Sequence, residues 1–267
     1  MQEVKEAIGL DKVDLSGKLL LIREHHKTNA NFILNSIISH CKDENSMTCL
    51  LLFHNTFGHF HNIGMKLGYN LRKESTSRVK VVEALKIISK NIHQISGVQC
   101  DDPPRFDIGN NNNDLVQKLA QVVKTEFFNA SKEYDSQKIY IIIDDLSHLF
   151  DMGLETEDVW LFIRHLRSLV EQEPSLVMCI ATHVYEATEE LCQSNVLAMS
   201  LQYFAELVVD VLPLGSGYSK DISGKMIVSW KSPIERLKFR WPEKSTHLFK
   251  LYDQKVKLFA PGSSLVM

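Results

Sequence analysis

The sequence contains few of the residues that mark a cross-linked or low-complexity chain. Its 267 residues include 5 Cys, 12 Gly and 7 Pro. The cysteines are odd in number and scattered, with no CxxC pair, which argues against a disulfide framework and against a cysteine-based zinc site. With 44% hydrophobic and 24% charged residues, the composition is that of an ordinary globular protein and excludes collagen-like and wholly disordered chains.

Long apolar segments are also missing. No hydrophobic run approaches the roughly 18–20 residues that a membrane-spanning helix needs. The first ten residues, MQEVKEAIGL, contain no apolar stretch of the kind found in a secretory signal. We therefore expect an intracellular, soluble protein that has no membrane partner.

What the sequence does contain is a regular alternation of short apolar runs and helical patterns. Helices are predicted at about 30–41, 58–67, 114–134, 157–172 and 195–205, with Thr28 or Asn29 capping the first and Asp114 the third. Buried strands are predicted at about 18–24, 48–54, 78–85, 139–143, 176–182 and 206–212. This order predicts an α/β fold with a mostly parallel central sheet flanked by helices.

The pattern changes after Pro213. Residues 225–230 alternate with strand period, and 247–252 and 255–260 flank a tight turn, so antiparallel hairpin strands are predicted at the C-terminal end. Residues 86–113 show no sustained period and include Pro103–Pro104 and Asn110–Asn113. We interpret the chain as one domain over 1–267, with a mobile insertion at about 86–113.

A phosphate-binding loop is expected after the first strand of a nucleotide-binding α/β fold, but its glycines are absent. The turn reads REHHKTNA over residues 23–30 and has no glycine. Lys27 and Thr28 resemble the last two positions of GxxxxGK[ST], whereas Glu24 adds negative charge. No other GK[ST] occurs. The sequence therefore predicts a degenerate P-loop, without ATP hydrolysis and without a bound cofactor.

Two carboxylates follow the most apolar strand. Asp144 and Asp145 come directly after residues 139–143, as in a Walker B strand, whose carboxylate assists Mg²⁺. Without a partner lysine and hydroxyl they have little phosphate chemistry to perform. The favoured interpretation is that they cap the following turn.

Other candidate sites are weaker. Five histidines come early in the chain, but their spacing matches no zinc pattern, so no metal is expected: His25, His26, His54, His59 and His61. GxSxG and HExxH are absent, and no catalytic residue is assigned. Tyr203, Phe204, Leu207 and Val209 are expected to pack in the core rather than to stack on bases.

Charge is concentrated near the end of the sequence. Residues 219–267 hold ten Lys and Arg against four Asp and Glu, whereas the whole chain has a net charge of −3. Such a segment suits RNA or an acidic protein surface. A solvated hairpin surface explains the same pattern and is favoured on the charge alone.

Several segments, taken in order, resemble a known family. They are Val82–Leu85, Ile143–Ser147, Phe162–Ile163 with Arg167, Gly217–Lys225, Trp230–Pro233 and Lys250–Ala260. Together with the missing P-loop, they resemble a RecA-like ATPase fold without its catalytic motifs and, more narrowly, the Elongator complex protein 6 family. The resemblance extends over nearly the whole chain except residues 86–113.

The resemblance implies a non-catalytic subunit. Members of the family form a hetero-hexameric RecA-like ring with Elongator proteins 4 and 5, and the ring joins the catalytic Elongator subcomplex. That assembly binds tRNA and supports 5-carboxymethyl-type modification of the wobble uridine (position thirty-four). The family also implies a cytoplasmic location, with a nuclear fraction.

For such a ring, candidate contacts can be named from the sequence. Arg164, Arg167 and the basic C-terminal segment are candidates for a neighbouring subunit's interface. The loop at 183–195 carries Glu186, Glu189 and Glu190, which repel phosphate. Candidate tRNA contacts are therefore Lys231, Arg236, Lys238 and Arg240.

Two alternatives are open. The first is a divergent P-loop ATPase that uses Lys27, Thr28 and Asp144. The second is a degenerate recombinase-paralogue adaptor in DNA repair.

Overall fold

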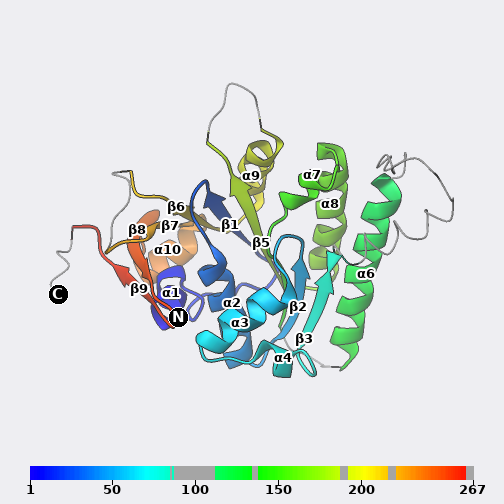
Figure 1. Cartoon of the computed structure of the whole chain (residues 1–267), viewed down its shortest axis with the longest axis horizontal. Helices are drawn as coiled ribbons and strands as arrows, with labels where there is room; N and C mark the ends of the chain where they lie inside the picture. The colour runs from blue at the N-terminus through cyan, green and yellow to red at the C-terminus, as the bar shows by residue number, and fades with distance from the viewer. Residues whose placement is uncertain (85, 87–111, 134–137, 187–191, 216–220, 263–267) are drawn as a thin grey trace, which may run out of the picture.

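The computed structural model describes residues 1–84, 86, 112–133, 138–186, 192–215 and 221–262. Figure 1 shows a central sheet with helices on both sides. The strands are β1 (Leu19–His25), β2 (Met47–Leu52), β3 (Val79–Glu83), β4 (Ile139–Ile143), β5 (Leu176–Val184), β6 (Leu207–Leu212), β7 (Gly224–Trp230), β8 (Lys244–Leu251) and β9 (Val256–Phe259).

The helices connect the parallel strands and extend over both faces of the sheet. They are α1 (Gln2–Ile8), α2 (Asn31–Asp43), α3 (Phe57–Lys66), α4 (Leu71–Glu74), α6 (Asn112–Glu133), α7 (His148–Asp151), α8 (Thr156–Gln172), α9 (Gln193–Phe204) and α10 (Pro233–Phe239). None of the helices in the described ranges has both the length and the apolar character needed to span a membrane.

The strands form one sheet in the order β3-β2-β4-β5-β1-β6-β7-β8-β9. In this order, the neighbouring strands β3, β2, β4, β5, β1 and β6 pair in parallel. Strands β7, β8 and β9 extend the sheet with antiparallel pairing. The predicted mostly parallel sheet with antiparallel C-terminal strands is therefore confirmed.

Two apolar layers explain why the parallel strands are continuously hydrophobic. Alternate residues of each strand face opposite sides of the sheet, and here both sides are covered. On one face the sheet packs against α1, α2 and Phe60 of α3. On the other face it packs against α6, α8 and α9. In β4, for example, Ile142 belongs to the first layer and Ile141 to the second.

The antiparallel strands are fastened to the N-terminal helix. Helix α1 lies near β9 in Figure 1, and the Glu3 carboxylate accepts a hydrogen bond of 2.7 Å from the Leu258 backbone N–H. The indole N–H of Trp230 on β7 donates to the Ile8 carbonyl at 3.0 Å. The first and last parts of the described chain therefore stabilise each other.

Several details differ from the sequence predictions. Helices α1, α4, α7 and α10 were not predicted, and α6 begins at Asn112, so Asp114 lies inside the helix rather than at its cap. Ala30 is the N-cap residue of α2, and Asn29 contributes only by accepting a hydrogen bond from the Asn31 N–H at 2.9 Å. Most of the proposed insertion at 86–113 lies outside the described residues.

Candidate functional site

The strand order locates the place where a ligand would bind in this type of sheet. The chain leaves β1 through α2 on one face, and it leaves the neighbouring β5 through α9 on the other face. Open α/β sheets bind ligands in the crevice at such a point, beyond the carboxyl ends of the strands. Because a helix N-terminus attracts anions, the start of α2 is the expected phosphate position.

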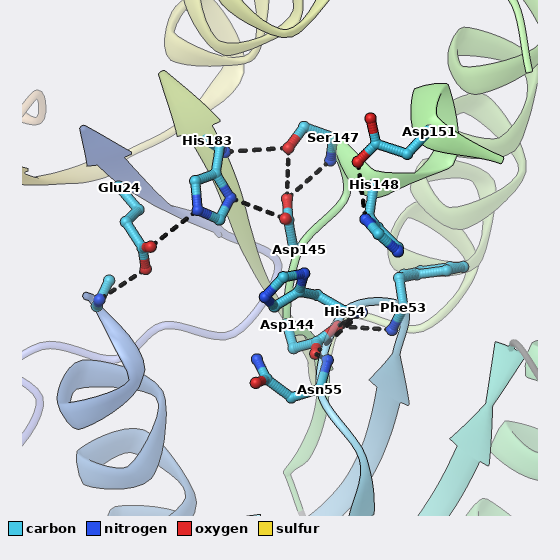
Figure 2. Close-up of polar contacts among 11 residues, drawn as sticks. Glu24, Phe53, His54, Asn55, Asp144, Asp145, Ser147, His148, Asp151 and His183 are labelled. Atoms are coloured by element: carbon cyan, nitrogen blue, oxygen red, sulfur yellow. Dashed lines mark hydrogen bonds and ion pairs between the residues drawn. The ribbon is translucent and has the colours of Figure 1, made fainter. Parts of the chain in front are cut away.

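In this chain a carboxylate of the protein itself occupies that position. Glu24 lies near the end of β1, and its Oε2 accepts a hydrogen bond of 2.6 Å from the Ala30 backbone N–H at the start of α2. Ala30 offers no side-chain cap of its own. Figure 2 shows the Glu24 carboxylate between this backbone N–H and His183. The carboxylate thus makes the kind of contact that a nucleotide phosphate would make.

His183 holds Glu24 in this place. Glu24 and His183 are directly paired in the parallel register of β1 and β5, and His183 Nε2 lies 2.8 Å from Glu24 Oε1. The other ring nitrogen, Nδ1, lies 2.8 Å from Asp145 Oδ2. The hydrogen bonds to Asp145 and Glu24 raise the pKa of His183 to about 10, although burial opposes the shift. His183 is therefore an imidazolium that bridges two carboxylates at neutral pH.

Asp145 is fixed from its own loop as well. Burial by itself would raise the pKa of Asp145, but the hydrogen bond and charge of His183 and the hydrogen bond of Ser147 bring it below the usual value. Asp145 Oδ1 accepts from the Ser147 N–H at 3.0 Å and from its hydroxyl at 2.5 Å. The Ser147 hydroxyl oxygen accepts in turn from the backbone N–H of His183 at 3.2 Å.

Asp144, the other carboxylate of the Walker-B-like pair, closes the loop after β2. Its oxygens accept from the backbone N–H groups of Phe53 and Asn55, each at 2.6 Å, and of His54 at 3.3 Å. Burial raises the pKa of Asp144 despite these bonds. The oxygens of Asp144 are thus engaged with the backbone of the loop after β2 (Figure 2).

The two P-loop-like residues do not converge on a phosphate position. The Lys27 side chain is largely exposed, and its Nζ lies 3.4 Å from the Glu186 carboxylate. The Thr28 hydroxyl donates to the carbonyl oxygens of His25 at 2.5 Å and of Val211 at 3.1 Å. Lys27 also has φ 64°, in the left-handed region that favours glycine. Lys27 thus pairs with the segment after β5, and Thr28 bonds the carboxyl ends of β1 and β6.

A second polar group lies at the carboxyl end of β1, on the side of β6. Arg23 makes a bidentate pair with Asp210 of β6, with Nε 2.6 Å and Nη2 2.8 Å from the two carboxylate oxygens. His25 Nε2 lies 3.1 Å from the same carboxylate. Burial would raise the pKa of Asp210, but the hydrogen bonds of His25 and Arg23 lower it. The group borders a polar cavity of about 310 Å³ that is also lined by Lys231 and Arg236.

The sequence-predicted contact residues fall on two separate helices or their ends. Lys231 precedes α10, Arg236 and Lys238 lie within it, and Arg240 is its C-cap. Lys238 Nζ lies 5.0 Å from the Phe239 ring centroid. Arg164 and Arg167 lie on α8, and the Arg167 guanidinium stacks 4.6 Å from the Phe204 ring centroid. The structure therefore gathers the candidate tRNA contacts into one segment around α10, and it places the ring candidates Arg164 and Arg167 on α8.

The expectation that four hydrophobic residues near β6 all pack in the core is wrong for two of them. Leu207 and Val209 are buried, but Tyr203 is 82% exposed and Phe204 is 48% exposed, at the end of α9. Met199, one turn before Tyr203, is 60% exposed. Helix α9 buries Leu197 and Leu201 and presents the other side to the outside. We refer to Met199, Tyr203 and Phe204 as the α9 patch.

His183, His148 and Asp151 were not identified from the sequence as site residues. His183 was assigned only to the start of a loop, whereas the structure makes it the centre of the polar network. The sequence feature that could have identified them is the presence of polar residues at the ends of several buried strands. The strand order that brings Glu24 beside His183 is required to interpret that signal.

Comparison with known proteins decides the family. The sequence model of a family described as "Elongation complex protein 6" matches residues 7–253. The chain belongs to the Elongator complex protein 6 family. This confirms the resemblance seen in the sequence segments.

Members from distant organisms align with nearly the whole chain. Human Elongator complex protein 6 is 25% identical over 254 residues, which cover 93% of this chain and 92% of the human protein. The Drosophila melanogaster protein is 24% identical and covers 96% and 95%. The Dictyostelium discoideum protein is 23% identical and covers 81% and 77%.

Solved structures show the same fold. An uncharacterized protein of Pyrococcus horikoshii, crystallised with an unknown peptide, has a TM-score of 0.62 at 14% identity and covers 98% of both chains. A KaiC-like protein of the same organism has a TM-score of 0.53 at 12% identity and covers 91% of this chain and 90% of its own. The RecA-like fold expected for the family is therefore confirmed.

Proposed function

We propose that this chain is a non-catalytic subunit of Elongator. In this proposal it forms a hetero-hexameric RecA-like ring with Elongator proteins 4 and 5, and the ring binds tRNA and supports 5-carboxymethyl-type modification of the wobble uridine. The catalytic Elongator subcomplex carries out the chemistry. The place of action is the cytoplasm, with a nuclear fraction.

The observation that carries the non-catalytic role is the contact between Glu24 and the Ala30 N–H. A triphosphate at the start of α2 would have to displace this carboxylate and approach Asp145 as well. Displacement would also leave the His183 imidazolium without one of its two partners. Both costs oppose nucleotide binding, because uncompensated buried charges are strongly unfavourable. A subunit whose nucleotide position is filled by its own carboxylate would act by binding its partners rather than by hydrolysing ATP.

Exposed apolar side chains support assembly with other subunits. Isolated surface hydrophobics are common, but the three side chains of the α9 patch lie within the last two turns of one helix and include two aromatic rings. Phe204 contacts both Arg167 and Trp160 of α8, so the patch continues onto that helix. Aromatic residues with arginine are typical of the energetically important centre of an interface. We assign the α9 patch with Arg164 and Arg167 to the contact with Elongator protein 4 or 5.

The basic residues around α10 are the proposed tRNA contacts. Lys231, Arg236, Lys238 and Arg240 cluster on one short segment and its ends. Phosphate groups attract such a cluster whatever the base sequence, and binding releases counterions. Helix α10 has no buried residue, and Lys231, Lys238 and Arg240 are exposed, whereas Arg236 is half-buried with its Nε enclosed.

Charge reversal at these four positions is expected to weaken tRNA binding by the assembled ring about 10-fold or more at low salt. It should also flatten the salt dependence, since each lost phosphate contact reduces the log–log slope by about 0.7–0.9. A matched control reverses four basic residues elsewhere, Lys42, Lys66, Arg72 and Lys73. Filter binding over a range of salt concentrations measures both quantities. Equal affinities for the two reversed rings would refute this assignment.

Affinity purification of the tagged chain from cells tests the proposed assembly. Elongator proteins 4 and 5 should co-purify with it in comparable amounts. Recovery of recombination proteins instead would favour the recombinase-paralogue adaptor. Recovery of neither, together with ATP hydrolysis that is lost in Lys27→Ala, would favour a divergent ATPase.

A further inference from the structure

A group of metal-ligand side chains lies beside the Glu24–His183–Asp145 network. His54 follows β2, Asp145 follows β4, and His148 begins α7. One ligand atom from each of these three side chains lies within 4.8 Å of the others. We propose that His54, Asp145 and His148 bind a zinc-class divalent metal ion at the carboxyl edge of the sheet. This inference is independent of the ring assembly proposed above.

The donor set matches a known coordination type. Two imidazole nitrogens and one carboxylate oxygen form a three-ligand zinc set, which leaves the fourth tetrahedral position to water. Metal–ligand distances of about 2.1 Å place ligand atoms about 3.4 Å apart in a tetrahedron. The ligand atoms, within 4.8 Å of one another, therefore need only small side-chain rotations to close on an ion. Magnesium is disfavoured, because it prefers oxygen ligands in octahedral geometry.

His148 is already oriented as a metal ligand. Its Nδ1 lies 2.8 Å from Asp151 Oδ2, so Nδ1 carries the hydrogen and Nε2 is left as the coordinating atom. Metal-ligating histidines usually have such a carboxylate on the nitrogen that does not bind the metal. Figure 2 shows the Asp151 carboxylate next to the His148 ring.

Asp145 is also held in a fixed orientation. Ser147 donates two hydrogen bonds to Oδ1, and His183 contacts Oδ2. A carboxylate oxygen has more than one lone pair, so a metal ion can be added without breaking these contacts. Asp145 is buried, which limits the competition from water.

His54 provides the adjustable ligand. Its side chain is exposed, and its ring centroid lies 5.2 Å from that of His148 and 5.9 Å from that of His183. Its backbone N–H is fixed on Asp144, so the position of the residue is defined while the ring can turn.

The surrounding charge favours a cation. The carboxyl groups of Glu24, Asp144, Asp145 and Asp151 lie around the cluster, and the His183 ring lies between Glu24 and Asp145. A dication at the three ligands reduces the remaining repulsion among these carboxylates. It does so on the side of Asp145 away from Glu24, so the contact of Glu24 with Ala30 is retained.

The test is a zinc titration of the full 267-residue chain after removal of metals with a chelator. We expect one Zn²⁺ per chain, measured by competition with a chromophoric chelator. His54→Ala and His148→Ala should each weaken binding about 100-fold, and Asp151→Asn about 10–100-fold. The exposed His26 lies outside the group, so His26→Ala serves as the matched control with unchanged affinity.

Folding of the variants is checked by circular dichroism and melting temperature without zinc. Because the His54 side chain is exposed, His54→Ala should keep the parent fold. This variant alone therefore tests whether the three side chains bind zinc. Co²⁺ in place of Zn²⁺ should give a visible spectrum of a four-coordinate ion in the parent and not in His54→Ala. Absence of zinc binding by the parent, or equal zinc affinity of the parent and His54→Ala, would overturn the proposal.

Discussion

The double variant Met199→Glu, Tyr203→Glu is expected to fold like the parent chain but to lose its co-purification with Elongator proteins 4 and 5. Both side chains are exposed on α9, so their replacement removes no core contact in the isolated chain. In an interface, two unpaired carboxylates would have to be desolvated, which costs several kcal/mol. We therefore expect an affinity loss of about 100-fold or more.

The control for this variant uses another exposed methionine. Met65 lies on α3 and is 53% exposed, so Met65→Glu adds a similar charge to a different surface. Affinity purification of parent, double variant and Met65→Glu under the same conditions gives the comparison. Circular dichroism and the melting temperature establish that each variant is folded. Full recovery of both partners with the double variant would remove the α9 patch from the interface.

His183→Gln is expected to lower the free energy of unfolding by about 2–3 kcal/mol near pH 6. The imidazolium of His183 separates two carboxylates, Glu24 and Asp145, whose side chains are 15% and 6% exposed. Breaking a buried ion pair costs about 3–5 kcal/mol. The value is reduced here because the His183 side chain is 25% exposed and is partly screened by solvent.

The effect of His183→Gln should depend on pH in a defined direction. The folded-state pKa of His183 is raised to about 10, above its ordinary value of 6.5. The folded state therefore binds the proton more tightly than the unfolded state, and the stabilisation is complete below pH 6.5. It is lost as pH rises from 6.5 through about 10, so parent and variant should converge in alkaline solution.

Urea unfolding at pH 6, 8 and 10, in a buffer with chelator, measures this dependence. The exposed His165 on α8 provides the control, and His165→Gln should change stability by less than about 0.5 kcal/mol at each pH. A difference between parent and His183→Gln that stays constant with pH would show that His183 is not the bridging imidazolium.

The parallel sheet could be predicted from the sequence because burial on both faces makes each strand a short apolar run. Residues 139–143 match β4, and the run at 206–212 differs from β6 by one residue. Helix α8 was also found, since its apolar residues recur at helical spacing over 17 residues. Such elements are determined by local pattern alone.

Helix α10 shows where local pattern was insufficient. It has clear start signals, because Pro233 is its first residue and the Ser232 hydroxyl oxygen accepts from the Glu235 N–H at 3.3 Å. It has no buried face, however, and Ile234 and Leu237 are largely exposed. Without a periodic apolar stripe, the segment looks like a loop between strands. Tyr203 and Phe204 gave the opposite error, because they were predicted to be buried and are exposed. Sequence alone cannot distinguish an apolar helix face that packs in the core from one that is exposed for an interface.

The central polar network required the topology. The sequence alone indicated that Glu24 would oppose phosphate, but not what holds it there. Glu24 and His183 are far apart in the chain and become neighbours because β5 inserts between β4 and β1. The same insertion places Asp145 within reach of His183. No spacing rule predicts such a group, because its members are brought together by the strand order.

Isothermal titration of Mg·ATP into the full chain tests most directly whether the protein's own carboxylate fills its nucleotide position. With Glu24 bound to the start of α2 and held by His183, no heat of binding is expected at millimolar nucleotide. A saturable isotherm with a dissociation constant in the micromolar range would contradict the account.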